Sequence, residues 1–342
     1  MPEKLVSIIL LTWNGSKYIE ACIDSISAQR YRPLELVVID NGSSDGTSEM
    51  LSRFVPVKLS IPWKAEYLPI NTGFARGMNR GITLSSGDYV LTLNQDLVMK
   101  EDYISILVEE LERKGTYPKG SAGGKILKWE SEFTSDNAII DSAGHEIYTD
   151  RIVEGRGKGK PSIQFNETCP VFGVNAAAAI YNRNALDAIS EKGAIFDPDF
   201  FSYLEDIDLD YRLILRGYES VYSPGALARH AGAGSGGRRN FTIRFRAHTN
   251  RYLTWLKNES ASELLRDFFP ILLQEVIQFL RTLFTNPLLL MSWFVFPSKA
   301  KRAYRKGRRL YSDGIKDYSR LRGFIKSGRI AGKLKRVGRQ DA

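Results

Sequence analysis

Three apolar runs in the N-terminal part of the chain each end directly in polar residues. The runs are Val6–Leu11, Glu35–Ile39 and Tyr89–Leu93. Apolar runs of this length are typical of strands that are buried on both faces of a parallel sheet. The segment after the first run repeats apolar residues at helical spacing, at Ile19, Cys22, Ile23 and Ile26. Strands that alternate with helices predict βαβ units, and therefore an α/β fold with a mainly parallel sheet.

The third run is followed by Asn94, Gln95 and Asp96. In open α/β sheets, ligands bind beyond the carboxyl ends of the strands. Asp96 is therefore expected where a divalent cation bound to phosphate would be held. His230 follows a later short strand, and a histidine in that place is either structural or a further ligand.

Residues 71–81 open the helix that precedes this third strand, and the segment is rich in glycine. Gly73 lets the backbone approach a ligand closely, and the N-terminus of a helix favours anions. Arg76 and Arg80 lie four residues apart on one helix face, so at least one of them could reach a diphosphate. The alternative is that both arginines are simply solvated.

A dense group of carboxylates lies later in the chain, at Glu205, Asp206, Asp208 and Asp210. Apolar residues around the group repeat at helical spacing, so Glu205 and Asp206 are expected at a helix N-terminus. Helix capping explains one acidic residue there. It does not explain four in six positions, because these repel one another unless a cation, a substrate or an arginine offsets their charge.

The length of 342 residues and the hydrophobic content of 43% are enough for a substantial core. Single cores stop growing at roughly 250–300 residues, so two units are expected. The two cysteines, Cys22 and Cys169, lack a metal-binding spacing, and Cys22 lies on the apolar face of a predicted helix. The N-terminus leads straight into a strand and shows no signal-peptide pattern, so a cytoplasmic protein is expected.

The C-terminal third is apolar from residue 264 to residue 296 but is interrupted by polar residues and prolines. Because no stretch of about 20 apolar residues is uninterrupted, a membrane-spanning helix is not expected. Amphipathic helices in the membrane interface are expected instead. The aromatic residues expected to insert are Phe268, Phe269, Trp293, Phe294 and Phe296. The alternative is a helical hairpin packed on the N-terminal part or on a second subunit of a homo-oligomer.

Residues 298–342 contain 16 Lys and Arg but only 3 Asp and Glu, whereas the rest of the chain is mildly acidic. Such a tail is typical of a segment that contacts an anionic surface, either a membrane or nucleic acid. Nucleic-acid binding rests on the tail alone and gives no reason for Asp40, Asp96 and Asp206. An anionic membrane surface is therefore the expected partner, and no nucleic acid is expected.

Five motifs, in this order, resemble those of family 2 glycosyltransferases of the GT-A fold. They are VSIILLTWNG, VVIDNGSSDGT, NTGFARGMNRG, LNQD and FSYLEDIDLDYRL. More closely, the chain resembles the rhamnosyltransferase-like branch that builds bacterial cell-surface polysaccharide. The resemblance covers about residues 5–235. It implies a Rossmann-like sheet flanked by helices in a catalytic domain of residues 1–240, with a helical, basic, membrane-associating region at 241–342.

The resemblance also implies a set of donor-binding residues. Thr12, Asn14 and Asp40 would line the nucleoside pocket, with Asp40 meeting the pyrimidine base. Gly73, Arg76 and Asn79 would lie along the nucleotide and its diphosphate.

The cation site implied by the resemblance departs from the family pattern. Asn94 takes the place of the first carboxylate of the D-x-D motif, so Asp96 would carry most of the protein's charge on Mg²⁺ or Mn²⁺. One carboxylate is sufficient when the substrate phosphate also coordinates the cation. His230 matches a position that supplies a further metal ligand in some relatives.

The reaction implied is an inverting sugar transfer. Asp206 would act as the general base toward an acceptor hydroxyl, and Glu205 would orient the acceptor or Asp206. The expected donor is deoxythymidine diphosphate rhamnose, with a uridine diphosphate hexose next. The acceptor would be a saccharide, free or linked to polyprenyl diphosphate, at the inner face of the cytoplasmic membrane. A sugar nucleotidyltransferase is the less favoured enzyme class, because residues 12–16 lack the basic, glycine-rich loop that it needs.

Overall fold

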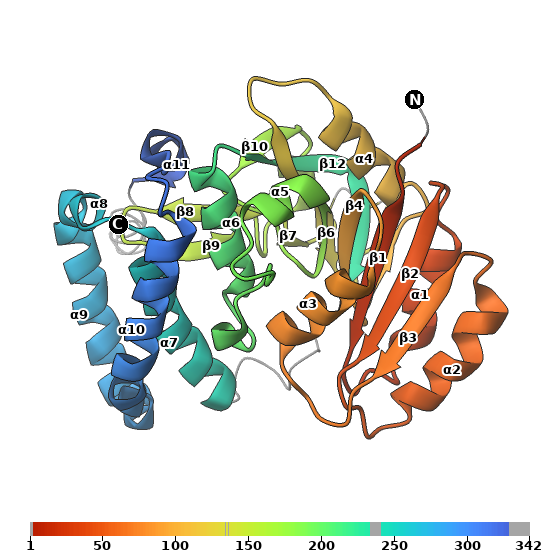
Figure 1. Ribbon diagram of the computed structural model, residues 1–342, viewed down its shortest axis with the longest axis horizontal. Coiled ribbons are helices and arrows are strands. Elements are labelled where there is room, and N and C mark those ends of the chain that lie inside the picture. The colour runs from red at the N-terminus through yellow and green to blue at the C-terminus, as the bar shows by residue number, and fades with distance from the viewer. Residues whose placement is uncertain (1–2, 134, 136, 233–240, 328–342) are drawn as a thin grey trace.

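The structure is a computed structural model that describes residues 3–133, 135, 137–232 and 241–327, except for the side chains of residues 293–295. Its main sheet has the strand order β10-β12-β6-β11-β4-β1-β2-β3. Helices cover both faces of this sheet, and a second group of helices lies at the end of the molecule away from β3 (Figure 1). The predicted α/β fold class is confirmed.

One half of the sheet is parallel. It comprises β1 (Val6–Thr12), β2 (Leu34–Asp40), β3 (Trp63–Tyr67) and β4 (Tyr89–Asn94). The connecting helices are α1 (Ile19–Ser27), α2 (Thr47–Lys58) and α3 (Phe74–Leu84). Alternate residues of β1 enter two different cores, Ile8 on one face and Ile9 on the other. This burial on both faces explains why the sequence shows continuous apolar runs.

The other half of the sheet is mixed. Its strands are β5 (Leu97–Met99), β6 (Lys119–Lys128), β7 (Ile140–Ser142), β10 (Cys169–Val171), β11 (Ala178–Asn182) and β12 (Glu219–His230). Strand β11 runs antiparallel to β4, whereas β12 runs parallel to β6. The helical elements here are α4 (Tyr103–Glu112), η1 (Ser162–Gln164), α5 (Arg183–Ala188), η2 (Pro198–Phe200) and α6 (Glu205–Leu215).

A small second sheet joins the end of the described chain to its middle. Its strands are β8 (His145–Tyr148), β9 (Val153–Gly155) and β13 (Ile325–Lys326), in the order β13-β8-β9. Because β13 pairs with β8, the residues after the C-terminal helices return to the body of the protein.

The region after residue 240 is mostly helical, as predicted. It contains α7 (Phe241–Asn258), α8 (Ala261–Arg266), α9 (Phe268–Thr285), η3 (Pro287–Met291), α10 (Ser292–Leu310) and α11 (Tyr318–Phe324). Helices α7 and α10 pack together next to α6, and α9 lies at the outside of the molecule (Figure 1). The division into units 1–240 and 241–342 stays a prediction.

Helix α9 is the one helix in the described part of the chain that is long and apolar enough to cross a membrane by length and composition. Among the aromatic residues expected to insert, Phe268 and Phe269 are exposed. Phe296 instead packs against Tyr252 of α7, with ring centroids 5.5 Å apart. The side chains of Trp293 and Phe294 lie outside the described part of the structure.

Candidate active site

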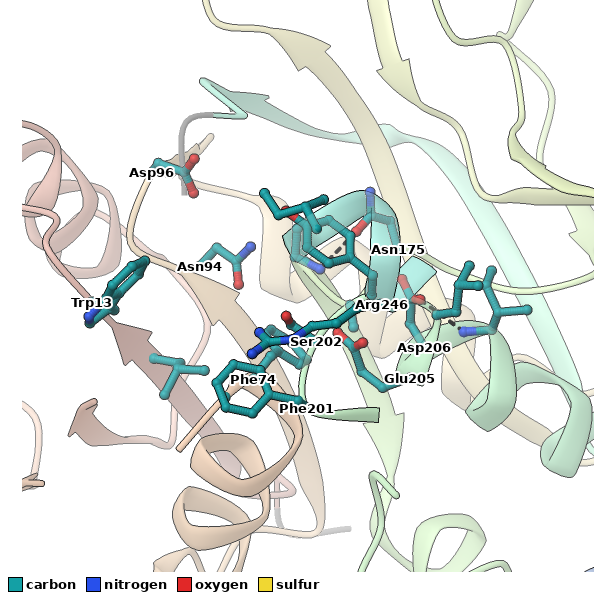
Figure 2. Close-up of a pocket in the computed structure, with 18 of the residues that line it drawn as sticks. Trp13, Phe74, Asn94, Asp96, Asn175, Phe201, Ser202, Glu205, Asp206 and Arg246 are labelled. Carbon is teal, nitrogen blue, oxygen red and sulfur yellow. Dashed lines mark hydrogen bonds between the residues drawn. The ribbon is translucent and has the colours of Figure 1, made fainter. Parts of the chain in front are cut away.

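A cleft of about 720 Å³ opens at the carboxyl ends of β1 and β4. The first turn of α6 and the start of α7 form its other walls (Figure 2). Of the residues predicted from sequence, those that line the cleft are Thr12, Gly73, Asn94, Asp96, Glu205, Asp206 and His230. Its position is the one expected for an open α/β sheet, beyond the strand ends.

Asp96 and His230 come together in this cleft although they lie far apart in the sequence. Oδ1 of Asp96 is 3.5 Å from Nε2 of His230, and Nδ1 of His230 is 2.8 Å from Oδ2 of Asp141. The pairing of β5 with β12 sets this approach, because it places His230 opposite Leu97. Burial alone would lower the pKa of His230, but the carboxylates of Asp141 and Asp96 outweigh it and raise the pKa to about 9.

The donor atoms of Asp96 and His230 suit a divalent cation, since carboxylate oxygen and imidazole nitrogen are both ordinary ligands. The described residues contain no group of three or more His, Cys, Asp and Glu side chains that could hold a metal ion. The protein therefore offers a partial ligand set, which fits a cation that is completed by the phosphates of a bound nucleotide.

Gln95 forms a contact that the sequence did not reveal. Its side chain accepts from the backbone N–H of Trp13 at 2.7 Å and donates to the carbonyl of Trp13 at 2.8 Å. A Cβ on Gly15 would lie 2.1 Å from Oε1 of Gln95, so only glycine leaves room for this pair. The contact holds the Trp13 indole at the edge of the cleft, opposite α6 (Figure 2).

The residues predicted for the nucleoside pocket are connected by hydrogen bonds, and of the three only Thr12 lines the cleft. Thr12 and Asp40 are register partners in β1 and β2, and the Thr12 hydroxyl donates to Asp40 at 2.9 Å. Asp40 also accepts from the hydroxyls of Ser43 and Ser48, and it is not among the residues that line the cleft. Asn14 accepts from the backbone N–H of Ser44 and so connects the loops after β1 and β2. Their nucleoside-binding roles stay predictions.

The residues predicted to lie along the diphosphate are not all brought to the cleft. Gly73 lines it, with a φ of 88°. Arg76 is exposed on α3 and is not among the lining residues. The Asn79 amide is engaged with the backbone of residues 195 and 196, which it both accepts from and donates to. Asn79 therefore fixes the chain that leads to α6, and its part in nucleotide binding stays a prediction.

The four carboxylates of the acidic motif have separate surroundings. Glu205 and Asp206 face the cleft, whereas Asp208 and Asp210 are fully buried and do not line it. Burial and the neighbouring Asp206 carboxylate raise the pKa of Glu205 well above its usual range. Burial and the Asp206 charge thus favour the protonated form of Glu205, which can donate a hydrogen bond. Its Oε2 is buried and has no hydrogen-bond partner among the described residues.

His145 on β8 lies behind Asp206. Its Nδ1 is 2.7 Å from Oδ2 of Asp210, and its Nε2 is 3.7 Å from Oδ2 of Asp206. Gly173 leaves room for this arrangement, because a Cβ there would lie 1.8 Å from the Asp210 carboxylate. Burial opposes a charge on His145, but Asp210 and Asp206 raise its pKa above the usual value of 6.5. His145 thus lies between the carboxylates of Asp206 and Asp210.

The loop before α6 has an uncommon backbone. Phe201, Tyr203 and Leu204 have φ angles of 62°, 72° and 68°, a region in which L residues are strained. Asn250 of α7 donates from Nδ2 toward the carbonyls of residues 200, 202 and 203, at 2.8–3.2 Å. The guanidinium of Arg246, one turn earlier on α7, stacks 3.6 Å from the centre of the Phe201 ring (Figure 2). Helix α7 thus holds the strained loop in place.

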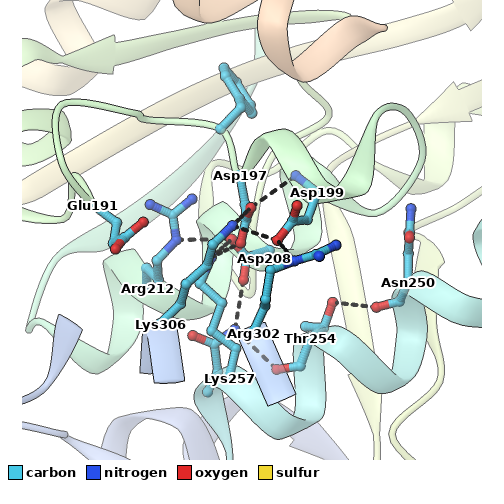
Figure 3. Close-up of polar contacts among 12 residues, drawn as sticks. Glu191, Asp197, Asp199, Asp208, Arg212, Asn250, Thr254, Lys257, Arg302 and Lys306 are labelled. Atoms are coloured by element: carbon cyan, nitrogen blue, oxygen red, sulfur yellow. Dashed lines mark hydrogen bonds and ion pairs between the residues drawn. The ribbon is translucent and has the colours of Figure 1, made fainter. Parts of the chain in front are cut away.

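Buried ion pairs attach α6 to the C-terminal helices (Figure 3). Lys257 of α7 lies 2.8 Å from Asp208 and 2.9 Å from Asp197. Asp197 also pairs with Lys306 of α10. Burial opposes ionisation of Asp197, but the two lysines lower its pKa below the usual range. Asp208 therefore has a structural role, because its charge is offset by Lys257. This explains the presence of one of the four carboxylates in the acidic motif.

Comparison with known proteins gives a family match over residues 7–189, more than half of the chain, to the model described as glycosyl transferase family 2. Among curated proteins, poly-beta-1,6-N-acetyl-D-glucosamine synthase of Staphylococcus epidermidis is 26% identical over 224 residues. That match covers 65% of this chain and 48% of the synthase, so the chain spans about half the length of this relative.

Two solved structures share the fold at low sequence identity. The mannosyltransferase PcManGT from Pyrobaculum calidifontis, in complex with GDP-Man and Mn²⁺, has a TM-score of 0.52 at 16% identity; the match covers 91% of this chain and 75% of that one. GalNAc-T7 with UDP, GalNAc and Mn²⁺ has a TM-score of 0.58 at 13% identity, covering 74% and 48%.

Proposed function

The chain belongs to glycosyl transferase family 2, and from this premise we propose that it transfers a sugar from a nucleoside diphosphate donor to an acceptor hydroxyl with inversion at the anomeric carbon. It is a glycosyltransferase of the GT-A fold, and the expected GT-A architecture is confirmed. The observation that carries the proposed mechanism is the placement of Asp96 and Asp206. They project from opposite sides of one cleft (Figure 2).

Asp206 is the proposed general base. A carboxylate within hydrogen-bond reach of the acceptor hydroxyl takes its proton as the oxygen bonds to the anomeric carbon. The bond from that carbon to the diphosphate breaks at the same time, and the nucleoside diphosphate leaves on the opposite face. One displacement of this kind inverts the anomeric centre. Glu205, next to Asp206, would orient the acceptor through a hydrogen bond.

Asp96 and His230 are the proposed ligands of a divalent cation, Mg²⁺ or Mn²⁺, with Asn94 beside them as a neutral neighbour. When bound, such a cation balances the charge of the leaving diphosphate. Mn²⁺ in the two structural neighbours supports this proposal. The protein's own contribution is to bury Asp96 and to hold His230 through Asp141.

The proposed donor is deoxythymidine diphosphate rhamnose, because the ordered motifs resemble the rhamnosyltransferase-like branch most closely. A uridine diphosphate hexose is the second candidate, and UDP in the GalNAc-T7 structure favours it. The proposed acceptor is a saccharide or a polyprenyl-diphosphate-linked saccharide of cell-surface polysaccharide synthesis. The synthesis of a polysaccharide by the S. epidermidis relative supports that process.

A cytoplasmic position, peripheral on the membrane, is also proposed. The exposed apolar side chains of α9 support it, as do the basic residues after residue 298. The region after residue 240 would thus serve both as the membrane contact and as the support of the loop before α6.

A donor screen tests the proposed function. The purified chain is incubated with Mg²⁺ or Mn²⁺, an acceptor mixture and one nucleotide sugar at a time, and released nucleoside diphosphate is measured. Release that depends on the acceptor and is abolished by Asp206→Asn is expected for the rhamnose donor. Acceptor-dependent release from a uridine diphosphate hexose alone would replace the first candidate with the second. No release with any nucleotide sugar would contradict the proposal.

A further inference from the structure

Helix α9 turns polar residues toward the protein and apolar residues toward the outside, which is the opposite of a typical surface helix. Its polar residues Gln274, Gln278 and Thr282 point toward α7 and are buried or half-buried. Most side chains that α9 exposes are apolar, with Arg281 and Thr285 as polar exceptions near its end. The exposed apolar residues are Phe268, Phe269, Leu272, Leu273, Val276, Ile277, Phe279, Leu280, Leu283 and Phe284. A surface helix of a soluble protein normally buries its apolar side. The exposed face of α9 therefore needs an apolar partner.

A pocket of about 310 Å³ lies between α7 and α9, beside this apolar face. Helix α7 contributes Arg244, His248 and Arg251, and α9 contributes Arg281 and two threonines. These arginines give the pocket three cationic groups, and no carboxylate is among its lining residues. Guanidinium and hydroxyl donors that converge in this way suit a phosphate group.

The charge of the pocket is only partly compensated. Arg251 pairs with Glu275 of α9 at 2.8 Å and lies over the Trp255 ring. Neither Arg244 nor Arg281 forms an ion pair with a described residue. Two of the three guanidinium groups are thus available to an anion.

The apolar and basic features meet at one end of α9. Phe284 and Leu288 are 81% and 61% exposed, and they neighbour Thr285 and Leu289, which line the pocket. A ligand that fits both must carry a phosphate group on an apolar chain. We propose that this pocket binds the phosphate of an anionic membrane lipid, whose acyl chains lie along the exposed face of α9. The inference rests on the membrane association proposed above, and not on the choice of donor or acceptor.

Helix α7 separates this pocket from the active-site cleft. Thr242, Ile243 and Arg246 line the cleft, whereas Arg244 and His248 line the pocket. The bound headgroup would therefore lie one helix diameter, about 10 Å, from the cleft. It would fix the orientation of the cleft toward the membrane, and it would not itself be the sugar acceptor.

Vesicle co-sedimentation of the full chain tests this site. The vesicles contain phosphatidylcholine alone or an equimolar mixture with phosphatidylglycerol. The double variant Arg244→Gln/Arg281→Gln removes the two available guanidinium groups. The matched control, Arg53→Gln/Lys114→Gln, removes the same charge from exposed positions that lie outside the pocket and outside the region proposed to contact the membrane. Unchanged thermal unfolding verifies that both variants are folded.

We expect wild type to prefer the anionic vesicles, and the pocket variant to lose roughly tenfold in partitioning to them. Its weaker binding to phosphatidylcholine should stay unchanged, and the control should keep most of the preference. Equal losses of anionic-vesicle binding in the two double variants would contradict the proposed lipid site, since they would show that binding depends on general surface charge. Wild-type binding to both vesicle types alike would also overturn it while leaving membrane association intact.

Two further outcomes separate the remaining sources. If inorganic phosphate bound wild type but not Arg244→Gln/Arg281→Gln, and left vesicle binding by wild type unchanged at constant ionic strength, the pocket would take a soluble anion and the lipid assignment would fail. If wild type bound neither vesicle type and sedimented as a dimer, a second copy would cover α9, and the proposed membrane association would fail together with this site. Donor turnover, measured separately, is not affected by either result.

Discussion

Nδ1 of His145 lies 2.7 Å from Oδ2 of Asp210, a carboxylate that is completely buried in α6. The other imidazole nitrogen faces Asp206 at 3.7 Å. Burial raises the pKa of Asp210 to about 7, although His145 opposes this rise, so the pair shares a proton near neutral pH. The His145 imidazole is thus held directly behind the proposed base, where it orients the Asp206 carboxylate.

The first prediction concerns His145 and pH. Because its folded-state pKa is raised above 6.5, the stabilisation it gives is complete below pH 6.5 and is lost as the pH rises through the folded-state pKa. The free energy of unfolding of wild type, measured by urea denaturation, should therefore fall above pH 6.5. His145→Gln should show a smaller fall over the same range. An identical pH dependence in the two proteins would contradict the assignment.

Activity provides the second test of the same residue. His145→Gln should lower kcat and change the alkaline limb of the pH–rate profile, because the orientation of Asp206 depends on the titratable imidazole beside it. The KM for the donor should change little. A proportional loss of folded protein with an unaltered pH–rate profile would indicate a purely structural role.

The third prediction separates the two sides of the cleft. Asp96→Ala and Asp206→Asn should both abolish transfer, by a factor of at least about 10². Asp206→Asn should still bind the nucleotide sugar, since it leaves the Asp96 side intact, whereas Asp96→Ala should lose affinity for Mn²⁺ with the nucleoside diphosphate. Calorimetric titration measures both affinities. Near-normal turnover by Asp206→Asn would show that another group is the base.

The fourth prediction concerns the buried ion pairs around α6. Lys257→Met leaves Asp208 and Asp197 buried without their shared partner, so it should destabilise the protein by about 3–5 kcal/mol. Arg309→Met, which breaks an exposed pair with Glu191, serves as the control and should cost at most about 1 kcal/mol. Urea denaturation of both variants measures the difference. Similar losses of unfolding free energy in the two variants would mean that the buried ion pairs stabilise the protein no more than the exposed pair does.

The fifth prediction uses two glycines with positive φ. Gly73→Ala places a Cβ 2.6 Å from Phe201, whereas Gly46→Ala has a similar φ but open space around it. Backbone strain should cost Gly46→Ala about 1 kcal/mol. It should cost Gly73→Ala more, because the ψ of Gly73 is 166°, in a region that is essentially restricted to glycine. Gly73→Ala should in addition displace the loop before α6 and so lower kcat. Gly46→Ala should leave kcat unchanged. Equal activity of the two variants would mean that the contact with Phe201 does not position the loop.

Much of the fold could be predicted because it depends on local patterns. The runs that became β1, β2 and β4 are buried on both faces, and burial on both faces removes the polar alternation. The meeting of Asp96 with the cleft also followed from strand order, since the carboxyl ends of parallel strands share one edge of a sheet. That His230 would lie 3.5 Å from Asp96 needed the pairing of β5 with β12, which no local pattern encodes.

The distribution of the acidic motif could not be predicted for a related reason. Successive residues of a helix point in directions about 100° apart, so Asp208 turns away from the cleft, whereas Asp210 lies one turn after Asp206 on the same side, where His145 contacts both. Their partners, Lys257 and His145, come from distant elements. Asn250 gave no signal either, because its three carbonyl partners belong to a strained loop whose shape is visible only in three dimensions.

The buried pairs between α6 and the C-terminal helices also bear on biosynthesis. During translation, Asp197 and Asp208 leave the ribosome before Lys257 and Lys306 are made, so their carboxylates have no lysine partner in the nascent chain. Asn250 likewise arrives after the loop that it holds. The cleft therefore reaches its final form late in synthesis, when α7 and α10 have docked. A chain truncated before α7 would present an acidic, incompletely folded surface to chaperones and proteases.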